Sequence, residues 1–282
     1  EGAGTFKDCP MAHIAMLAPE LAEVQQMKVL RAGASGDLVT AVAPQTHFRL
    51  SGELSLPSAG HITEYVWEVR QPKGAASVFH PSASSPEVGF RANVAGRYTF
   101  RLRVRDAEEW SCLEAEREVE VLPEEAIHVE LTWHTPADED PTDEGQGAGS
   151  DMDLHFVHLD NALRNPHGED LWPPPGNGQP EGYFDDLWDT FWFYVTHDWG
   201  RISVGEDDPS LDRDDEDGAG PENLNLHLAE EGVTYKIGVH YWNDHGFGRS
   251  TPCVRVIIFG TEVASVCGCP MVRYDMWEVG TL

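Results

Sequence analysis

The sequence predicts an all-β protein in which two β-sandwich domains follow each other in tandem, the second with long acidic loops. Three observations predict this class. Short runs that alternate apolar and polar residues recur along the chain, as in strands with one buried and one wet face. Turn-forming Gly, Pro and Ser separate these runs. The 282 residues suffice for two domains, and no long helical pattern competes with the strands.

Changes of texture divide the chain into four parts. Residues 1–26 are expected to form an irregular N-terminal arm, because Pro19 interrupts the one stretch there with helical character. The first sandwich is assigned to residues 27–123 and the second to residues 124–266. A C-terminal tail is expected at 267–282.

Strands of the first domain are expected at alternating runs, beginning with 28–31, 47–50 and 65–69. The run at 97–105 alternates basic and apolar residues almost without exception, which marks a strand with one wet face. A further run at 116–121 closes the domain. Several strands at this spacing indicate a sandwich.

Two of these segments resemble the PKD (polycystic kidney disease) repeat family. The segment 65–68 (Tyr-Val-Trp-Glu) fits that family's strand with a core Trp, and Ala95 to Asp106 fits its Gly-x-Tyr-x-x-x-Leu-x-Val-x-Asp pattern. The resemblance covers about residues 28–121 and implies an immunoglobulin-like sandwich that acts as a spacer or adhesion module. Trp67 is then expected between the sheets, with stacking on a carbohydrate as the alternative.

The second domain shows the same strand texture but much longer loops. Its expected strands lie at 127–133, 153–157, 191–195, 234–241 and 254–259. Polar loops separate them, at roughly 136–150, 160–188 and 200–222. Loops of this length inside a compact domain are usually functional or ion-bound.

The charge of the chain excludes two classes of partner. Acidic residues outnumber basic ones 49 to 19, for a formal net charge of −30. Such a surface repels phosphate backbones and anionic lipid, so we expect no nucleic-acid partner and no membrane-surface binding. No run is long and apolar enough for a membrane span. The chain opens at Glu1 without Met, from which we expect an exported protein whose signal sequence has been removed.

Carboxylates gather in two segments of the second domain, at 138–153 and 206–223. Packing many anions into a loop is unfavourable unless a cation neutralises them. Calcium fits this chemistry, since it takes about six to eight oxygen ligands in loose geometry. We therefore predict calcium as the cofactor, with ligands drawn from Asp151, Asp153, Asp208, Asp212, Asp214, Asp215, Asp217, Glu222 and Asn223. The alternative is a solvated acidic loop without a fixed ion.

The alternation of strand residues refines the calcium prediction. Asp151, Asp153 and His155 are expected on one face of their strand, while the residues between them face the core. The polar turn at 243–246 follows another strand and is expected to join the same end of the domain.

The second half also resembles a bacterial family of uncharacterised secreted β domains. The pattern is Leu-Thr-Trp at 131–133, Asp-x-Asp-Leu-His at 151–155, an Asp-rich loop at 217–223 and Val-His-Tyr-Trp at 239–242. The resemblance spans about residues 127–260. It implies a secreted or surface-anchored protein without a defined task, in a family whose members often sit beside adhesion modules.

Sequence motifs for catalysis are missing. The chain holds no G-x-S-x-G and no H-E-x-x-H, and the C-x-C at 267–269 is not a C-x-x-C redox pair. We therefore expect a protein that is not an enzyme. A zinc site is an alternative, with the best set being His155, His158, His240 and His245. The first two of these face opposite sides of a regular strand, which weakens it.

Two disulfides are expected among the five cysteines, which implies an oxidising compartment. Cys9 is predicted to tie the N-terminal arm to Cys112. A hairpin turn at 260–261 places Cys253 diagonally next to Cys267 and Cys269, so Cys253 is expected to pair with one of them. The leftover thiol either links chains or stays buried and reduced.

Together these observations predict an exported, calcium-binding structural or adhesive protein at the cell surface or outside the cell, with a subunit of a fibre or coat as one form. The expected partners are other copies of the chain or other surface proteins. The alternative is a calcium-dependent module that binds extracellular polysaccharide through the aromatics Trp172, Tyr183, Phe184, Trp188 and Trp192. Among these, Trp172, Tyr183 and Trp188 are the expected glycan contacts. Loop and core packing competes as the explanation of these aromatics. A secreted hydrolase is the third candidate.

Overall fold

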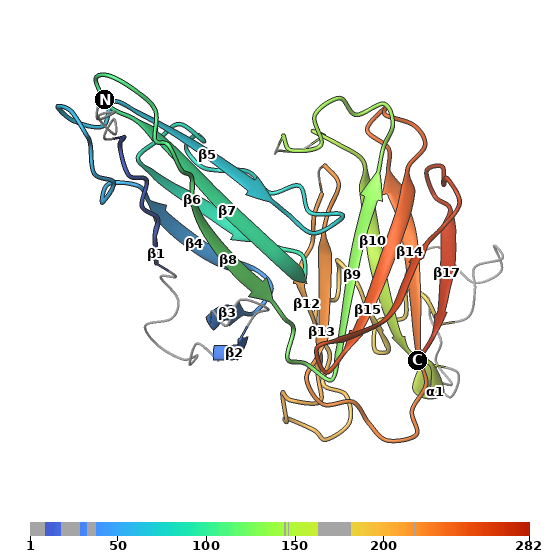
Figure 1. Cartoon of the computed structure of the whole chain (residues 1–282). Helices are drawn as coiled ribbons and strands as arrows, with labels where there is room; N and C mark the ends of the chain where they lie inside the picture. Colours follow the sequence, from blue (N-terminus) through green and yellow to red (C-terminus); the bar gives the residue numbers. More distant parts are fainter. Residues whose placement is uncertain are drawn as a thin grey trace, which may run out of the picture. The chain divides into compact units, whose positions relative to one another are not determined.

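The computed structural model describes residues 9–17, 29–32, 38–143, 145, 147–162, 182–216 and 218–282. The chain divides into two compact units, Glu1–Leu122 and Pro123–Leu282, and each is a sandwich of two β-sheets (Figure 1). Helix in the described ranges is confined to the four residues of α1, Leu159–Ala162, and none spans a bilayer. The prediction of an all-β protein with two sandwiches in tandem is confirmed.

In the first unit a three-stranded sheet packs against a five-stranded sheet. The smaller sheet has the order β1 (Ala15–Leu17), β4 (Thr46–Ser51), β6 (Glu87–Ala92). The larger sheet has the order β2 (Val29–Ala32), β3 (Leu38–Val42), β8 (Ala115–Val121), β7 (Gly96–Arg105), β5 (Glu64–Arg70). Strands β3 and β8 run parallel, whereas the other described pairs of this unit are antiparallel.

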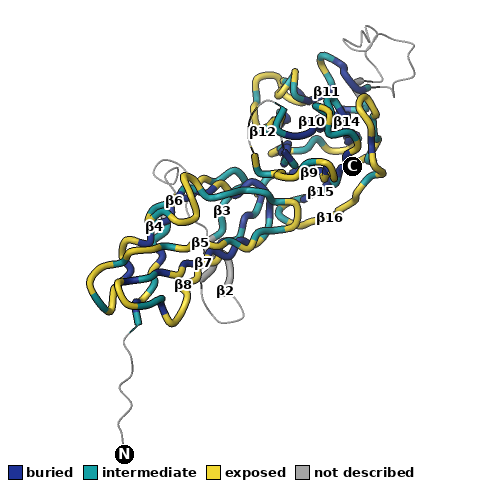
Figure 2. The backbone as a smooth tube through the Cα atoms, turned by 90° about the horizontal axis from the view of Figure 1, so that it is seen from above, coloured by how far each residue is buried: buried dark blue, intermediate teal, exposed yellow. Residues whose placement is uncertain are grey.

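Strand β7 folds as its alternating sequence predicts. Tyr98, Phe100 and Leu102 are fully buried, whereas Arg101, between Phe100 and Leu102, is exposed. Figure 2 shows buried and exposed positions interspersed along the backbone of both units. Arg101 Nε lies 3.0 Å from Glu116 Oε2 on β8. Exposed ion pairs contribute roughly 0–1 kcal/mol, so burial of the apolar face is the larger stabilising effect.

Trp67 and Tyr98 tie the core of the first unit to the backbone. Trp67 is 3% exposed and donates a hydrogen bond from Nε1 to the Ser85 carbonyl at 2.9 Å. The prediction of a core tryptophan is therefore confirmed. The Tyr98 hydroxyl donates to the Val94 carbonyl at 2.9 Å, the kind of backbone anchor found in immunoglobulin-like sandwiches.

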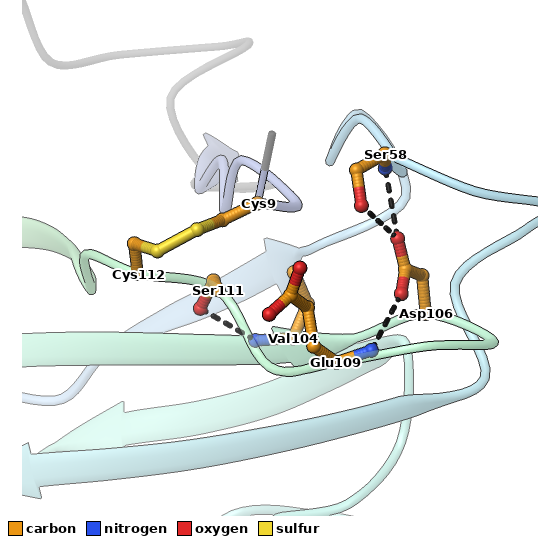
Figure 3. Close-up of a disulfide and its surroundings, with 7 residues drawn as sticks. All are labelled: Cys9, Ser58, Val104, Asp106, Glu109, Ser111 and Cys112. Carbon is orange, nitrogen blue, oxygen red and sulfur yellow. Dashed lines mark hydrogen bonds between the residues drawn. A yellow bond between two sulfur atoms is a disulfide. The ribbon is translucent and has the colours of Figure 1, made fainter. Parts of the chain in front are cut away.

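The described part of the N-terminal arm is fastened to the first unit, which differs from the irregular arm expected at 1–26. Cys9 forms a disulfide with Cys112 (Figure 3). Met11 pairs with Leu56, and β1 pairs with β4. A strand of three residues is too short for its alternation to be recognised in a sequence. Residues 1–8 and 18–26 lie outside the described ranges.

The second unit packs a four-stranded sheet against a five-stranded sheet, and its described pairs are antiparallel. The first sheet has the order β11 (Asp189–Thr190), β10 (Asp151–His158), β14 (Tyr235–Asn243), β17 (Met276–Thr281). The second has the order β12 (Pro209–Arg213), β13 (Glu222–Leu226), β9 (Ile127–His134), β15 (Thr251–Ile258), β16 (Thr261–Cys267).

The end of the chain belongs to the second sandwich, which differs from the tail expected at 267–282. Strand β17 pairs with β14, with Trp277 opposite Val239. Trp277 and Val279 are partly buried against the core, so apolar burial holds this strand in place.

Strand β10 is buried on both faces, and its edge toward β11 is only briefly paired. Met152, Leu154 and Phe156 lie in the core between the sheets. The opposite face is covered by the segment that contains Tyr183 and Phe184. Pairing with β11 is described at Phe156 and Val157, so the earlier residues of β10 meet other partners along this edge.

Candidate metal centre

Three carboxylates from different elements converge in the second unit. Asp153 lies on β10, Asp214 follows β12, and Glu222 begins β13; one carboxylate oxygen of each lies within 4.8 Å of the others. Asp153 is 2% exposed and Glu222 is fully buried, whereas Asp214 is exposed. The carboxylate cluster therefore has two walls inside the protein and one opening to solvent.

Glu222 reaches this point because the two sheets meet at the sparsely paired edge of β10. Its Oε2 accepts a hydrogen bond from the backbone N–H of Leu154 at 2.6 Å. Its Oε1 lies 3.5 Å from the N–H of Asp215, at the other side of the turn between β12 and β13. Glu222 thus joins β10 to β13 and holds the intervening loop beside Asp153.

Glycine allows the two acidic segments of the sequence to meet beside the cluster. Gly218 has a φ of +74° and approaches Gly149 so closely that a Cβ on Gly149 would stand 2.3 Å from Gly218 N. A Cβ on Gly218 would stand 2.9 Å from the carbonyl oxygen of Pro141. Larger residues would therefore push the 138–153 and 206–223 segments apart.

Burial and mutual repulsion raise the pKa values of these carboxyl groups. Burial, followed by the nearby charge of Asp153, raises the pKa of Asp151 to about 8. Burial raises the pKa of Asp153 to about 8, although His155 opposes the shift. Burial, followed by the charges of Asp153 and Asp214, raises the pKa of Glu222 well above its usual range. At neutral pH the cluster must therefore hold protons or bind a cation.

Asp151 supplies a further oxygen beside the cluster. Its side chain is 7% exposed, and its Oδ1 has no hydrogen-bond partner among the described residues. The charges of Asp153 and Asp214 both act on it. A buried carboxylate oxygen without a donor is costly unless an ion or a proton compensates it.

His240 positions Asp153 from the neighbouring strand. Its Nδ1 lies 3.2 Å from Asp153 Oδ2, because Asp153 and His240 stand opposite each other in the β10–β14 pair. Burial lowers the pKa of His240 to about 4, so the ring is neutral at pH 7. In the tautomer that carries the proton on Nδ1, the ring donates to Asp153 when Asp153 is ionised, as it is with a bound cation. Such a donor fixes the orientation of a carboxylate ligand. From the sequence alone, His240 belongs to the alternative zinc site. Its contact with Asp153 depends on how β10 and β14 pair, and this pairing cannot be derived from the sequence of either strand alone.

The nine predicted metal ligands separate into distinct groups. Asp153, Asp214 and Glu222 form the cluster, with Asp151 beside them. Asp215 is held by Arg213 Nη2 at 3.0 Å. Asn223 is buried on β13 and points to the opposite face from its neighbour Glu222. Asp217 lies outside the described residues.

Two of the predicted ligands, Asp208 and Asp212, are not in the three-carboxylate group and have hydrogen-bond partners elsewhere. Asp208 Oδ1 accepts the N–H of Trp199 at 2.9 Å. Asp212 accepts hydrogen bonds from the Ser210 hydroxyl at 2.5 Å and from the Asn225 side chain. Both side chains are therefore engaged by residues of the β12 region.

Two of the three predicted glycan contacts, Tyr183 and Trp188, lie in the described part of the chain. Tyr183 is 1% exposed, and its ring lies on β14 where Gly238 has no side chain. The prediction that Tyr183 contacts a glycan is therefore wrong. Trp188 is half-buried against the ring of His158, at 5.4 Å between centroids. Trp172 lies outside the described residues.

The histidines of the zinc alternative have separate partners. His155 Nδ1 lies 2.6 Å from Asp189 Oδ2, and His158 Nε2 lies 3.0 Å from Glu230 Oε1. His245 Nδ1 lies 2.7 Å from the Gly149 carbonyl. Within the described ranges, the three-residue group of metal-ligating atoms contains no histidine.

The cysteines pair as two disulfides, Cys9–Cys112 and Cys253–Cys267, and Cys269 is free and exposed. The β15–β16 turn lies at Phe259-Gly260, with φ of +46° and +73°, rather than at 260–261. With a register shift after Val256, this turn places Cys253 directly opposite Cys267. The expectation that the leftover thiol is buried therefore does not hold.

Comparisons with known proteins found one family match and structural matches of low identity. The K319L-like PKD domain matches residues 35–123. Among solved structures, the adhesin InvE of Yersinia pseudotuberculosis matches with 9% identity and a TM-score of 0.20, over 80% of this chain. The match covers 53% of the adhesin chain, about half its length. No curated protein matches the chain. The first half of the chain therefore contains a PKD-like domain.

Proposed function

We propose that the chain is an exported structural or adhesive protein whose second unit binds a calcium ion through Asp153, Asp214 and Glu222. The convergence of these carboxylates from both sheets carries the proposal. Two of them are buried, and their repulsion would open the edge of β10 unless an ion or protons cancelled it. A divalent ion would staple β10 to the loop between β12 and β13.

The donor set favours calcium over the other common divalent ions. All three ligands are carboxylates, whereas zinc sites are usually built from His and Cys. Magnesium demands near-ideal octahedral geometry and keeps much of its water. Calcium accepts a larger and looser oxygen set, to which the buried Asp151 can add a fourth carboxylate. The exposed Asp214 leaves an entry path for the ion.

Two features support placement outside the cell and a role in structure or adhesion. The chain holds two disulfides, which persist in oxidising compartments. Its first half is a PKD-like domain, and this resemblance implies a spacer or adhesion module by analogy of fold. Other copies of the chain or other surface proteins are the proposed partners.

Thermal unfolding of the chelator-stripped protein, with and without added calcium, tests the ion. At calcium concentrations about 100 times the Kd, binding adds about 2.7 kcal/mol, so the Tm of the second unit should rise by several degrees. The matched control is Asp212→Asn, which removes a carboxylate from the same acidic segment but outside the cluster; it should keep the full response. An unchanged melting curve for the native chain would remove calcium from the proposal.

Sedimentation velocity on the same samples tests the fibre or coat subunit. Calcium-dependent growth of the sedimenting species would support assembly from copies of the chain. A monomer in both conditions would rule out self-assembly and leave another surface protein as the partner.

A further inference from the structure

Four aromatic side chains form a continuous row on the second unit, outside the carboxylate cluster. Trp192 and Phe193 occupy a turn, Trp242 lies near the end of β14, and Tyr274 lies in the turn before β17. Successive ring centroids are 5.2 Å apart for Phe193–Trp192, 5.8 Å for Trp192–Trp242 and 6.5 Å for Trp242–Tyr274. Three segments distant in sequence therefore contribute to one aromatic row.

The aromatic row is accessible to a ligand. Phe193 is 59% exposed and Tyr274 is 58% exposed, while Trp192 and Trp242 are half-buried. Phe191, which is buried, packs beneath Trp192 at 6.4 Å between centroids. Neighbouring aromatic rings that remain exposed to solvent, although a packed aromatic cluster lies next to them, indicate an interaction site.

Backbone geometry presents these rings at the surface. A strand is predicted at 191–195, but the N–H of Phe191 bonds to the Tyr194 carbonyl at 3.1 Å, forming a tight turn with Trp192 and Phe193 at its tip. The strand prediction is therefore wrong: the segment is an uninterrupted run of residues that favour strands, but its backbone bends into a turn.

Tyr274 adopts a backbone conformation that is unfavourable for its bulky side chain. Its φ is +74°, in the left-handed region where Gly or Asn is more stable. The turn is fixed by the bond from Tyr274 N–H to the Tyr241 carbonyl at 2.7 Å and by Asp275 Oδ2, which accepts the N–H of Val272 at 2.8 Å. Strain at an exposed aromatic residue indicates that the ring, rather than the turn, is what the position requires.

We propose that the aromatic row of Trp192, Phe193, Trp242 and Tyr274 binds a neutral polysaccharide by stacking of sugar rings. The negative faces of aromatic rings attract the polarised C–H groups of a sugar face. Arg273 lies beside the row, with its guanidinium 4.7 Å from the Tyr274 centroid and its Nε 3.4 Å from the Trp242 carbonyl. It offers donors for sugar hydroxyl groups.

Charge decides between the ligands that stack on aromatic rings. The net charge of −30 disfavours nucleic acids and acidic polysaccharides, which leaves neutral sugars. A protein partner would require a broad apolar patch, whereas this site consists of four rings in successive contact with one another. The inference rests on the proposed function in placing the chain outside the cell, and none of the four residues is a proposed calcium ligand.

Retention on insoluble cellulose and chitin, and affinity electrophoresis in gels containing xylan, dextran or starch, test the proposal. The native chain should be retained by at least one of these polysaccharides. Trp192→Ala and Trp242→Ala should weaken that binding at least tenfold. Trp110→Ala, a half-buried tryptophan of the first unit, is the matched control and should bind as the native chain does.

Tyr274→Gly separates binding from folding. Glycine relieves the left-handed backbone, so this variant should melt no lower than the native chain and yet bind the polysaccharide less well. Tyr274→Phe, which keeps the ring, should retain binding. Retention by none of the polysaccharides, or retention unchanged in the alanine variants, overturns the proposal. If the alanine variants instead break up an oligomer in sedimentation, the row is a protein interface and the proposal is also overturned.

Repeating the assay in EDTA keeps the two proposals apart. Binding that survives chelation, in a protein whose melting ignores calcium, leaves the aromatic row and removes the ion. If the melting curve depends on calcium but no polysaccharide retains the protein with or without EDTA, the calcium site stands and the polysaccharide proposal is overturned.

Discussion

Glu222 on β13 accepts the backbone N–H of Leu154 on β10 at 2.6 Å and thereby links the two sheets of the second unit. The same carboxylate stands within 4.8 Å of the oxygens of Asp153 and Asp214. These two roles of Glu222 depend on different properties of its side chain. The hydrogen bond to Leu154 requires only an acceptor oxygen, whereas the repulsion from Asp153 and Asp214 requires the negative charge. A substitution that keeps the oxygen and removes the charge distinguishes them.

Glu222→Gln is predicted to move stability in opposite directions with and without calcium. The amide oxygen still accepts the Leu154 N–H, and loss of one buried charge relieves repulsion, so the calcium-free protein should gain about 1–3 kcal/mol at pH 8. Calcium affinity should fall at least tenfold, about 1.4 kcal/mol. Urea unfolding of both forms measures both effects. Equal losses of stability in calcium and in EDTA would show that Glu222 has a purely structural role.

The fall of stability with rising pH should disappear or reverse when calcium is added. The pKa of Asp151 and of Asp153 is raised to about 8, above the unfolded value of about 4. Between these values the calcium-free native protein binds more protons than the unfolded chain, so its stability falls as pH rises from about 4 to 8. Calcium displaces those protons, and saturating calcium should therefore flatten or invert the slope. Melting curves across this range, in calcium and in EDTA, measure both slopes. A fall of equal steepness in both would contradict the prediction.

The carboxylate cluster was predictable in part from sequence. Acid density identified Asp153, Asp214 and Glu222, because clustered anions require compensation wherever they lie. Density could not exclude Asp208 and Asp212, whose partners depend on the local turn geometry around β12. His240 was not recognisable as the partner of Asp153, because that contact depends on the register of β10 against β14.

The fold was predictable where a strand is long and has one wet face. Strand β7 meets both conditions, and its alternation matches its burial. The three residues of β1 carry too few alternations to be recognised. The segment 191–195 was predicted as a strand because aromatic and β-branched residues favour strands, but residues 191–194 form a tight turn.

Asp106→Ala is predicted to destabilise the first unit. Asp106 Oδ2 accepts the Ser58 N–H at 2.8 Å and its hydroxyl at 2.6 Å, while Oδ1 accepts the Glu109 N–H at 2.9 Å (Figure 3). The Ser58 hydroxyl and these backbone donors hold the pKa of Asp106 well below its usual range, so its contribution is present above about pH 4 and lost in acid.

Removal of this acceptor leaves several backbone donors without their partner, and the Tm of the first unit should fall by several degrees. The control is Glu108→Gln, which removes the charge of an exposed side chain two residues after Asp106. This variant should melt as the native chain does. An unchanged Tm for Asp106→Ala would contradict the anchoring role.

The disulfides are predicted to differ in their effect on stability. The Cys9–Cys112 link spans 103 residues and Cys253–Cys267 spans 14, so the loop-closure model gives about 4.7 kcal/mol for a loop of roughly 100 residues and about 3 for one of roughly 15. Cys9→Ser with Cys112→Ser should therefore destabilise its unit more than Cys253→Ser with Cys267→Ser, as measured by urea unfolding. If the Cys253–Cys267 variant lost more stability, contacts in the native state, rather than loop closure in the unfolded chain, would determine the effect of each disulfide.

Thiol labelling of the native chain should modify Cys269 alone. It is the free and exposed cysteine among the five, whereas the other four are paired. Mass spectrometry after iodoacetamide treatment should find one adduct, and none in Cys269→Ser. More than one adduct under non-reducing conditions would contradict the pairing.

An anomalous difference map from crystals grown in calcium locates the proposed ion most directly. The cluster predicts a peak bounded by Asp153, Asp214 and Glu222, at about 2.3–2.6 Å from an oxygen of each. A peak elsewhere, for example at Asp208 or Asp212, or no peak in a well-ordered cluster at saturating calcium, would contradict the calcium staple.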